Sequence, residues 1–96
     1  MLFVALCHDK PGHLAVRLAT RDAHVGWLRA LGPRVRIAGP FFDDAAEEMQ
    51  GSIVVIEADD IADAKSTFAA DPYAAAGLFE RVEIRPWRWV VGAPTT

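Results

Sequence analysis

The stretch Gly51-Ser52-Ile53-Val54-Val55-Ile56 decides the fold, because it is the most strand-like part of the sequence. Its four consecutive β-branched residues favour an extended, buried backbone, so we expect a central strand here. Before it, residues 43–50 are rich in Asp and Glu and are interpreted as a polar, solvated hairpin connection. Residues 34–42 alternate at first and then reach Gly39-Pro40, which predicts a second strand that departs sharply.

After the central strand, the sequence indicates a helix and then a tight turn. Asp59 and Asp60 are expected to cap a helix over residues 61–69, whose apolar side chains recur at helical spacing. The helix should stop before Pro72, since the proline ring disfavours the helical conformation of Asp71. Aspartate is a favoured cap and proline a favoured first residue, so a new helical turn should begin there.

Gly77 is expected to end this turn with a positive φ. The last strand is then predicted to run from Leu78 toward Val90. Pro86 interrupts it, which places this part of the strand at a sheet edge or a bulge.

The N-terminal third is predicted to be a strand followed by a long helix. Residues 2–7 form a short apolar run, typical of a strand buried on both faces. A turn at Pro11-Gly12 leads into a helix over residues 13–31, and Thr20 could cap a second segment and break it. Arg21 is expected on the apolar stripe of this helix, and His24 at its edge, on the flank shared with Arg17. The stripe itself consists of Leu14, Leu18, Val25 and Leu28.

The predicted element order is β-α-β-β-α-β, in one domain covering residues 1–96. Four strands and two helices in this order favour a ferredoxin-like α+β fold, an antiparallel sheet with both helices on one face. The strands carry little polar alternation, so the open sheet face should be covered by a second copy in a homodimer.

Composition limits the classes of function. The net charge of −3 argues against a nucleic-acid partner, and the N-terminal apolar run is too short for a membrane span and lacks the basic flank of a signal peptide. We therefore expect a cytoplasmic protein. The single cysteine, Cys7, excludes an internal disulfide and is interpreted as a buried thiol. The histidines lack metal-ligand spacing, so no metal is predicted.

Six polar or aromatic residues are candidates for chemistry: His24, Asp71, Ser52, Arg21, Asp9 and Tyr73. A carboxylate beside an imidazole fixes its tautomer and makes it a general acid or base, so His24 and Asp71 would form a catalytic pair if they touch. Ser52 could donate a hydrogen bond to substrate or bond to the backbone. Arg21 could anchor an anionic or phenolic ligand or form a surface ion pair.

Several short motifs, in this order, resemble the YciI family over nearly the whole chain. The matching motifs are Asp9-Lys10, Arg21-Asp22-Ala23-His24, Ala38-Gly39-Pro40, Gly51-Ser52, Ala70-Asp71-Pro72-Tyr73, Ala76-Gly77 and Pro86. The resemblance implies a ferredoxin-like fold that pairs as a dimeric α+β barrel. It also implies a site of His24, Asp71 and Ser52, and a lyase-like activity of the kind that dehydrochlorinates a chlorinated hydroxyquinone. The sequence contains no cofactor motif, so no cofactor is predicted.

Three functional hypotheses follow. The first is a small dimeric lyase in which His24 and Asp71 perform acid–base chemistry on a small hydroxylated aromatic, with Arg21 and Ser52 binding the oxyanion. The second is a non-catalytic dimeric module that binds a ligand, with the pair as a structural hydrogen bond. The third, a haem- or quinone-handling monooxygenase, rests on analogy of fold.

Overall fold

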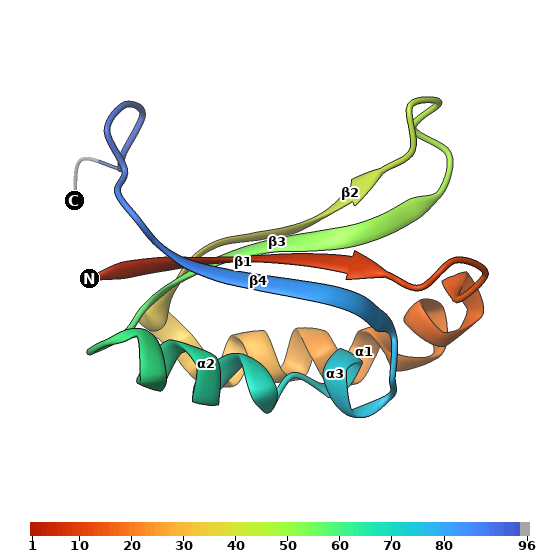
Figure 1. Cartoon of the computed structure of the whole chain (residues 1–96), viewed down its shortest axis with the longest axis horizontal. Helices are drawn as coiled ribbons and strands as arrows, with labels where there is room; N and C mark the ends of the chain where they lie inside the picture. Colours follow the sequence, from red (N-terminus) through yellow and green to blue (C-terminus); the bar gives the residue numbers. More distant parts are fainter. Residues whose placement is uncertain (95–96) are drawn as a thin grey trace.

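The computed structural model describes residues 1–94 as a four-stranded antiparallel sheet with its helices on one face (Figure 1). The strand order is β2-β3-β1-β4, so β2 and β4 are the edges. This arrangement confirms the predicted ferredoxin-like α+β fold. The elements in chain order are β1 (Leu2–Asp9), α1 (Leu14–Leu31), the short 3-10 helix η1 (Gly32–Arg34), β2 (Val35–Phe42), β3 (Met49–Glu57), α2 (Ile61–Ala69), α3 (Pro72–Ala75) and β4 (Phe79–Trp87).

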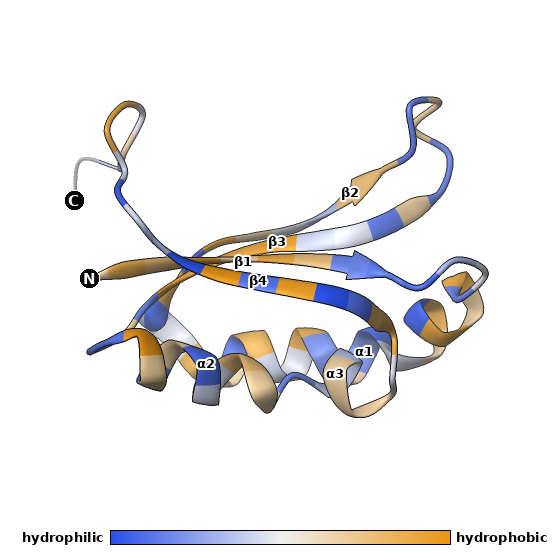
Figure 2. Ribbon diagram, viewed as in Figure 1, coloured by the Kyte–Doolittle hydropathy of each residue, from blue (hydrophilic) through white to orange (hydrophobic). Residues whose placement is uncertain are grey.

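The hydrophobic core lies between the sheet and the helices. Alternate residues of the two central strands face the helices and are buried, among them Phe3 and Ala5 in β1 and Val54 and Ile56 in β3. The intervening β1 side chains are only half-buried, so the expectation of burial on both faces is wrong for the single chain. Figure 2 shows apolar residues along β1 and β3. We call the side of the sheet away from the helices the outer face.

The structure corrects three predicted boundaries. α1 is one unbroken helix, and Thr20 does not cap a second segment, because a cap is a weak local preference that a continuous helix packed along the sheet overrides. β3 begins at Met49, which pairs with Phe42, so the connection before it is shorter than predicted. β4 ends at Trp87 rather than near Val90, because Trp87 pairs with Leu2, where β1 begins.

The turn at Asp71 forms as the sequence predicts. Asp71 has an extended backbone (ψ 126°) and its Oδ1 accepts a hydrogen bond from the Tyr73 backbone N–H at 2.9 Å. Pro72 occupies the first turn of α3, and Gly77 ends this segment with φ +73°. The carboxylate of Asp71 is therefore held at the start of a short helix and is itself buried.

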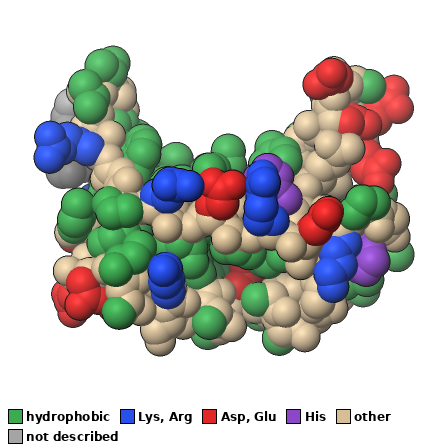
Figure 3. Space-filling view, in the orientation of Figure 1, with side chains coloured by type: hydrophobic (Ala, Val, Ile, Leu, Met, Phe, Trp, Pro, Cys, Tyr) green, Lys and Arg blue, Asp and Glu red, His purple; other side chains and the backbone are tan. Residues whose placement is uncertain are grey.

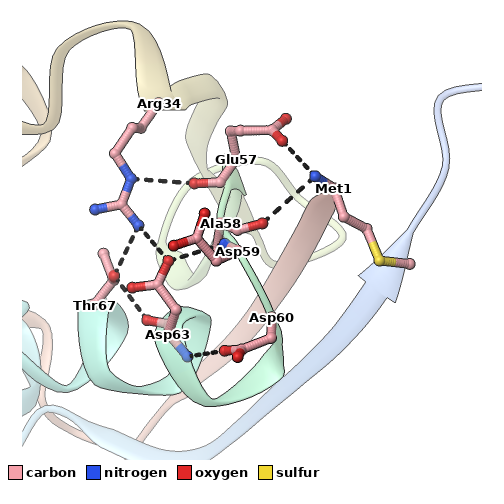
Figure 4. A network of polar contacts seen from close by, with 8 residues as sticks. All are labelled: Met1, Arg34, Glu57, Ala58, Asp59, Asp60, Asp63 and Thr67. Atoms are coloured by element: carbon pink, nitrogen blue, oxygen red, sulfur yellow. Dashed lines mark hydrogen bonds and ion pairs between the residues drawn. The ribbon is translucent and has the colours of Figure 1, made fainter.

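A polar network joins the end of β3 to α2 (Figure 4). Arg34 donates from Nε to the Glu57 carbonyl at 3.1 Å and from Nη2 to the Thr67 hydroxyl at 3.0 Å. Asp60 caps α2, as predicted, by accepting from the Asp63 backbone N–H at 2.8 Å. Asp59 instead donates its own N–H to the Asp63 side chain.

Two segments rise from the outer face at opposite ends of the sheet, the β2–β3 connection and the chain that follows β4 (Figure 3). The β2–β3 connection carries the acidic residues Asp43, Asp44, Glu47 and Glu48. Among the helices of residues 1–94, none combines the length and the hydropathy that a membrane crossing requires.

Candidate functional site

A histidine–aspartate pair lies between α1 and the cap of α3. His24 Nδ1 and Asp71 Oδ1 are 2.8 Å apart, and the two side chains are only 8% and 4% exposed. An ionised carboxylate can only accept hydrogen bonds, so His24 must carry its hydrogen on Nδ1 when it is neutral. Within residues 1–94, His24 Nε2 makes no hydrogen bond, which leaves its lone pair available to a ligand.

Tyr73 holds the imidazole ring from the other side. Its ring stacks on His24 with centroids 4.0 Å apart and planes inclined by 18°. The backbone of the same residue donates to Asp71, so α3 positions both neighbours of the imidazole. Burial raises the pKa of the Tyr73 phenol, the negative charge of Asp71 raises it further, and the positive charges of Arg17 and Arg21 oppose this shift.

Arg17 links this stack to the sheet. Its guanidinium donates to both carboxylate oxygens of Asp9, at 2.7 and 2.9 Å, and to the Ser52 hydroxyl at 2.8 Å. Its central carbon lies 4.7 Å from the centre of the Tyr73 ring. Burial alone would lower the pKa of Arg17, but its hydrogen bonds to Asp9 and the charge of that carboxylate outweigh it, so the pKa is raised.

These side chains border a cavity of about 370 Å³ between α1 and the β2–β3 half of the sheet. Ala38, Gly39 and Pro40 contribute backbone and small side chains to the opposite wall. Because Ser52 Oγ accepts from Arg17, its hydroxyl hydrogen remains to donate elsewhere. The cavity therefore combines a base, a hydroxyl donor and cationic groups, contributed by His24, Ser52, Arg17 and Arg21.

The structure brings together five of the six predicted site residues: His24, Asp71, Tyr73, Ser52 and Arg21. Asp9 lies behind Arg17 and does not line this cavity. Arg21 lines the cavity together with Val25 and Leu28, two residues of the stripe on which it was predicted, although its side chain is exposed. Leu18, predicted on the same stripe, is 55% exposed.

Arg17 is the site residue that the sequence reasoning missed. It is buried on α1 seven residues before His24, which puts both side chains on one face of the helix. The predicted stripe consists of leucine and valine positions, whereas the two buried side chains of α1 are polar. The signal that could have found Arg17 is the flank that it shares with His24.

Two other kinds of site, a nucleophilic cysteine and a metal site, are not favoured by the structure of residues 1–94. Burial raises the pKa of the Cys7 thiol to about 12, so this residue has little nucleophilic thiolate near neutrality. Over residues 1–94, no three His, Cys, Asp or Glu side chains are grouped closely enough to hold a metal ion.

Comparisons with known proteins identify related sequences and structures. Protein YciI of Escherichia coli O6:H1 is 36% identical over 97 residues, covering 94% of this chain and 99% of that protein. The solved 5-chloro-2-hydroxyhydroquinone dehydrochlorinase (TftG) of Burkholderia phenoliruptrix AC1100, in complex with 2,5-dihydroxybenzoquinone, superposes with a TM-score of 0.82. It is 30% identical and the alignment covers 92% of this chain and 94% of that one.

A solved antibiotic biosynthesis monooxygenase shares the fold at a TM-score of 0.57 and 16% identity, covering 94% of this chain and 99% of that one. At that identity the likeness concerns architecture alone. The family model of the YCII-related domain matches residues 1–88. The chain thus belongs to the YCII-related family, as its motifs suggested.

Proposed function

We propose that this protein is a lyase-type enzyme in which His24 and Asp71 act as an acid–base pair on a small hydroxylated aromatic substrate. The observation that carries this proposal is the buried 2.8 Å contact between the two side chains, with His24 lining a cavity. A general base must reach the proton that it removes, and Nε2 is the atom of the pair left to do so.

In the proposed step, Nε2 of His24 takes a proton from an O–H or C–H group of the substrate. The released electron pair forms a new π bond, and the leaving group departs with the electrons of its own bond. A chlorinated hydroxyhydroquinone would react in this way from its keto tautomer, in which a proton has moved from a hydroxyl oxygen to the ring carbon that bears chlorine. Removal of a remaining O–H proton then forms a C=O bond, shifts the adjacent ring C=C bond toward that carbon and expels chloride, so the sum is loss of HCl and a hydroxybenzoquinone product. Asp71 stabilises the imidazolium that forms and does not itself take the proton.

Two side chains of the cavity can stabilise the negative charge that develops on the substrate oxygen. Ser52 can donate its hydroxyl hydrogen, and Arg21 makes no ion pair with any residue among 1–94. Fixed donors aimed at a developing oxyanion are an effective source of catalysis. Asp9 is a positioning residue in this proposal. It orients Arg17, and Arg17 contacts both the Ser52 hydroxyl and the Tyr73 ring.

The relative with a solved structure supports the substrate class. That protein is a dehydrochlorinase of a chlorinated hydroxyhydroquinone, and its structure holds a dihydroxybenzoquinone. The cavity of this chain, at about 370 Å³, lies in the range of small-molecule sites.

The test is chloride release from 5-chloro-2-hydroxyhydroquinone and related halogenated hydroquinones. His24→Ala should lower kcat/KM by about 10²- to 10⁴-fold, because a general base contributes about that much. His13→Ala is the matched control, since His13 does not line the cavity. Equal rates for the wild type and His24→Ala would sink the proposed role of the pair.

One observation favours a non-catalytic ligand-binding module instead. Asp71 Oδ1 also accepts the Tyr73 N–H, so the carboxylate has a structural role in capping α3. If hydroxyquinones bind but no halogenated hydroquinone turns over, this alternative holds and the lyase proposal fails.

We also propose that a second copy covers the outer face. Apolar residues of this face, including Ile37 and Ile53, stay exposed, and the half-buried side chains of β1 lie between the two edge strands. Ile53→Lys should therefore convert a dimer to a monomer in light scattering. Ile61→Lys is the matched control, because Ile61 has nearly the same exposure (37% against 38%) but lies on α2. A wild-type monomer would refute the pairing.

A further inference from the structure

Asp71 borders a second cavity, one to which His24 does not contribute. This cavity has a volume of about 210 Å³ and lies among α2, α3 and β4. Its walls are largely apolar and include Phe68, Phe79 and Ile84. The same buried carboxylate thus stands between the histidine of the first cavity and a separate hollow.

One oxygen of this carboxylate has no partner in the described part of the chain. Oδ1 accepts both hydrogen bonds of Asp71, from His24 and from the Tyr73 backbone, and none is made to Oδ2. Yet no fully enclosed side-chain oxygen or nitrogen in residues 1–94 lacks a partner. Oδ2 is therefore not fully enclosed, and Asp71 lines the second cavity.

The composition of the cavity defines what it could accept. An ionised carboxylate oxygen only accepts, so the ligand must present a donor. Val82 turns toward the helices but is 41% exposed, which leaves an apolar surface for the body of a ligand. Lys65 lines the same cavity and disfavours a cationic ligand by charge repulsion.

We propose that this second cavity binds a small neutral hydroxyl compound, a phenol or an apolar alcohol, whose O–H donates to Asp71 Oδ2. Its apolar body packs against Phe79, Val82 and Ile84. Because one carboxylate would then serve both cavities, occupancy of the second changes the hydrogen bond that Asp71 makes to His24. This inference goes beyond the proposed lyase activity and does not depend on turnover.

The experiment uses phenol as the probe and toluene as its isosteric control, with methyl NMR of the full chain. Phenol should shift the methyl signals of Val82 and Ile84 and the imidazole nitrogen signals of His24. Toluene should bind about tenfold more weakly, because it lacks the hydrogen bond to a charged acceptor. Val82→Phe, and separately Ala74→Leu, should abolish the phenol shift of Ile84 by filling the cavity from two different elements.

Three results would overturn the proposal: equal affinity for phenol and toluene, shifts confined to Val25 and Leu28 of the first cavity, or an Ile84 shift that persists in both cavity-filling variants. Loss of the Val82 and Ile84 shifts together with normal chloride release would reject the second site and leave the lyase proposal standing. Phenol binding in the second cavity without chloride release from any halogenated hydroquinone would support the second site and reject the lyase proposal.

Discussion

Replacing Arg17 with methionine tests the ion pair that supports the candidate site. The side chains of Arg17 and Asp9 are almost completely buried, and two hydrogen bonds join them while a third reaches Ser52. Methionine keeps much of the length of the side chain but leaves the Asp9 carboxylate buried without its partner. Removing one member of a buried ion pair costs about 3–5 kcal/mol.

That loss is large against the whole stability of the fold, which for a chain of this length is about 5–14 kcal/mol. Urea unfolding followed by tryptophan fluorescence would measure it. Arg29→Met is the matched control on the same helix, because Arg29 is exposed in the last turn of α1. We expect the control to change the free energy of unfolding by less than about 1 kcal/mol.

A double-mutant cycle separates the pair from general loss of packing. Asp9→Asn combined with Arg17→Met removes both charges, so the double variant should be more stable than the sum of the single losses by about 1–3 kcal/mol. Additive losses, or a loss below about 1 kcal/mol for Arg17→Met alone, would refute the account of Arg17 as the support of the site.

Three further outcomes are expected. Burial raises the pKa of the Cys7 thiol from 9.0 to about 12, so the native protein should resist thiol reagents at pH 8. Between pH 9 and 12 the thiol ionises in the unfolded chain but not in the folded one, so the free energy of unfolding should fall as the pH rises through this range. Gly51→Ala would place a methyl group against the Phe41 ring and the Cys7 carbonyl oxygen, and it should lower the free energy of unfolding in urea by about 1–3 kcal/mol. Gly39→Ala should be tolerated, because the space beside Gly39 is open. Asp60→Ala should cost about 1 kcal/mol through loss of the α2 cap, and Asp59→Ala, whose side chain does not cap, about half of that or less.

Contrary results are equally specific. Rapid labelling of the folded thiol at pH 8 would show that β1 opens easily. Equal effects of the two glycine substitutions would remove the steric explanation, and equal effects of the two aspartate substitutions would remove the capping one.

The fold was predictable because its signals are local. The β-branched run at residues 53–56, the Asp71-Pro72 step and the positive φ of Gly77 each act through their nearest neighbours, and the structure contains all three features. Strand ends were not predictable in the same way. β4 ends where its neighbour β1 begins, and this limit depends on pairing between residues 85 positions apart in sequence.

The site was predictable in its members but not in its connections. Whether His24 touches Asp71 depends on how α1 packs beside α3, 47 residues later, and sequence alone left this contact open. The burial of Arg17 was not predicted, because hydrophobic periodicity assumes that a helix buries its apolar side chains. In α1 the buried positions are an arginine and a histidine, which the carboxylates of Asp9 and Asp71 make possible.

The most direct test of the central claim is the tautomer of His24, measured from its imidazole ¹⁵N shifts at a pH where the ring is neutral. We expect the hydrogen on Nδ1 and a bare Nε2, since Asp71 accepts from Nδ1. The urea-unfolded chain is the reference, because Asp71 no longer holds the ring there. A folded protein with the hydrogen on Nε2 would contradict the account, because the pair could not then present a base to the cavity.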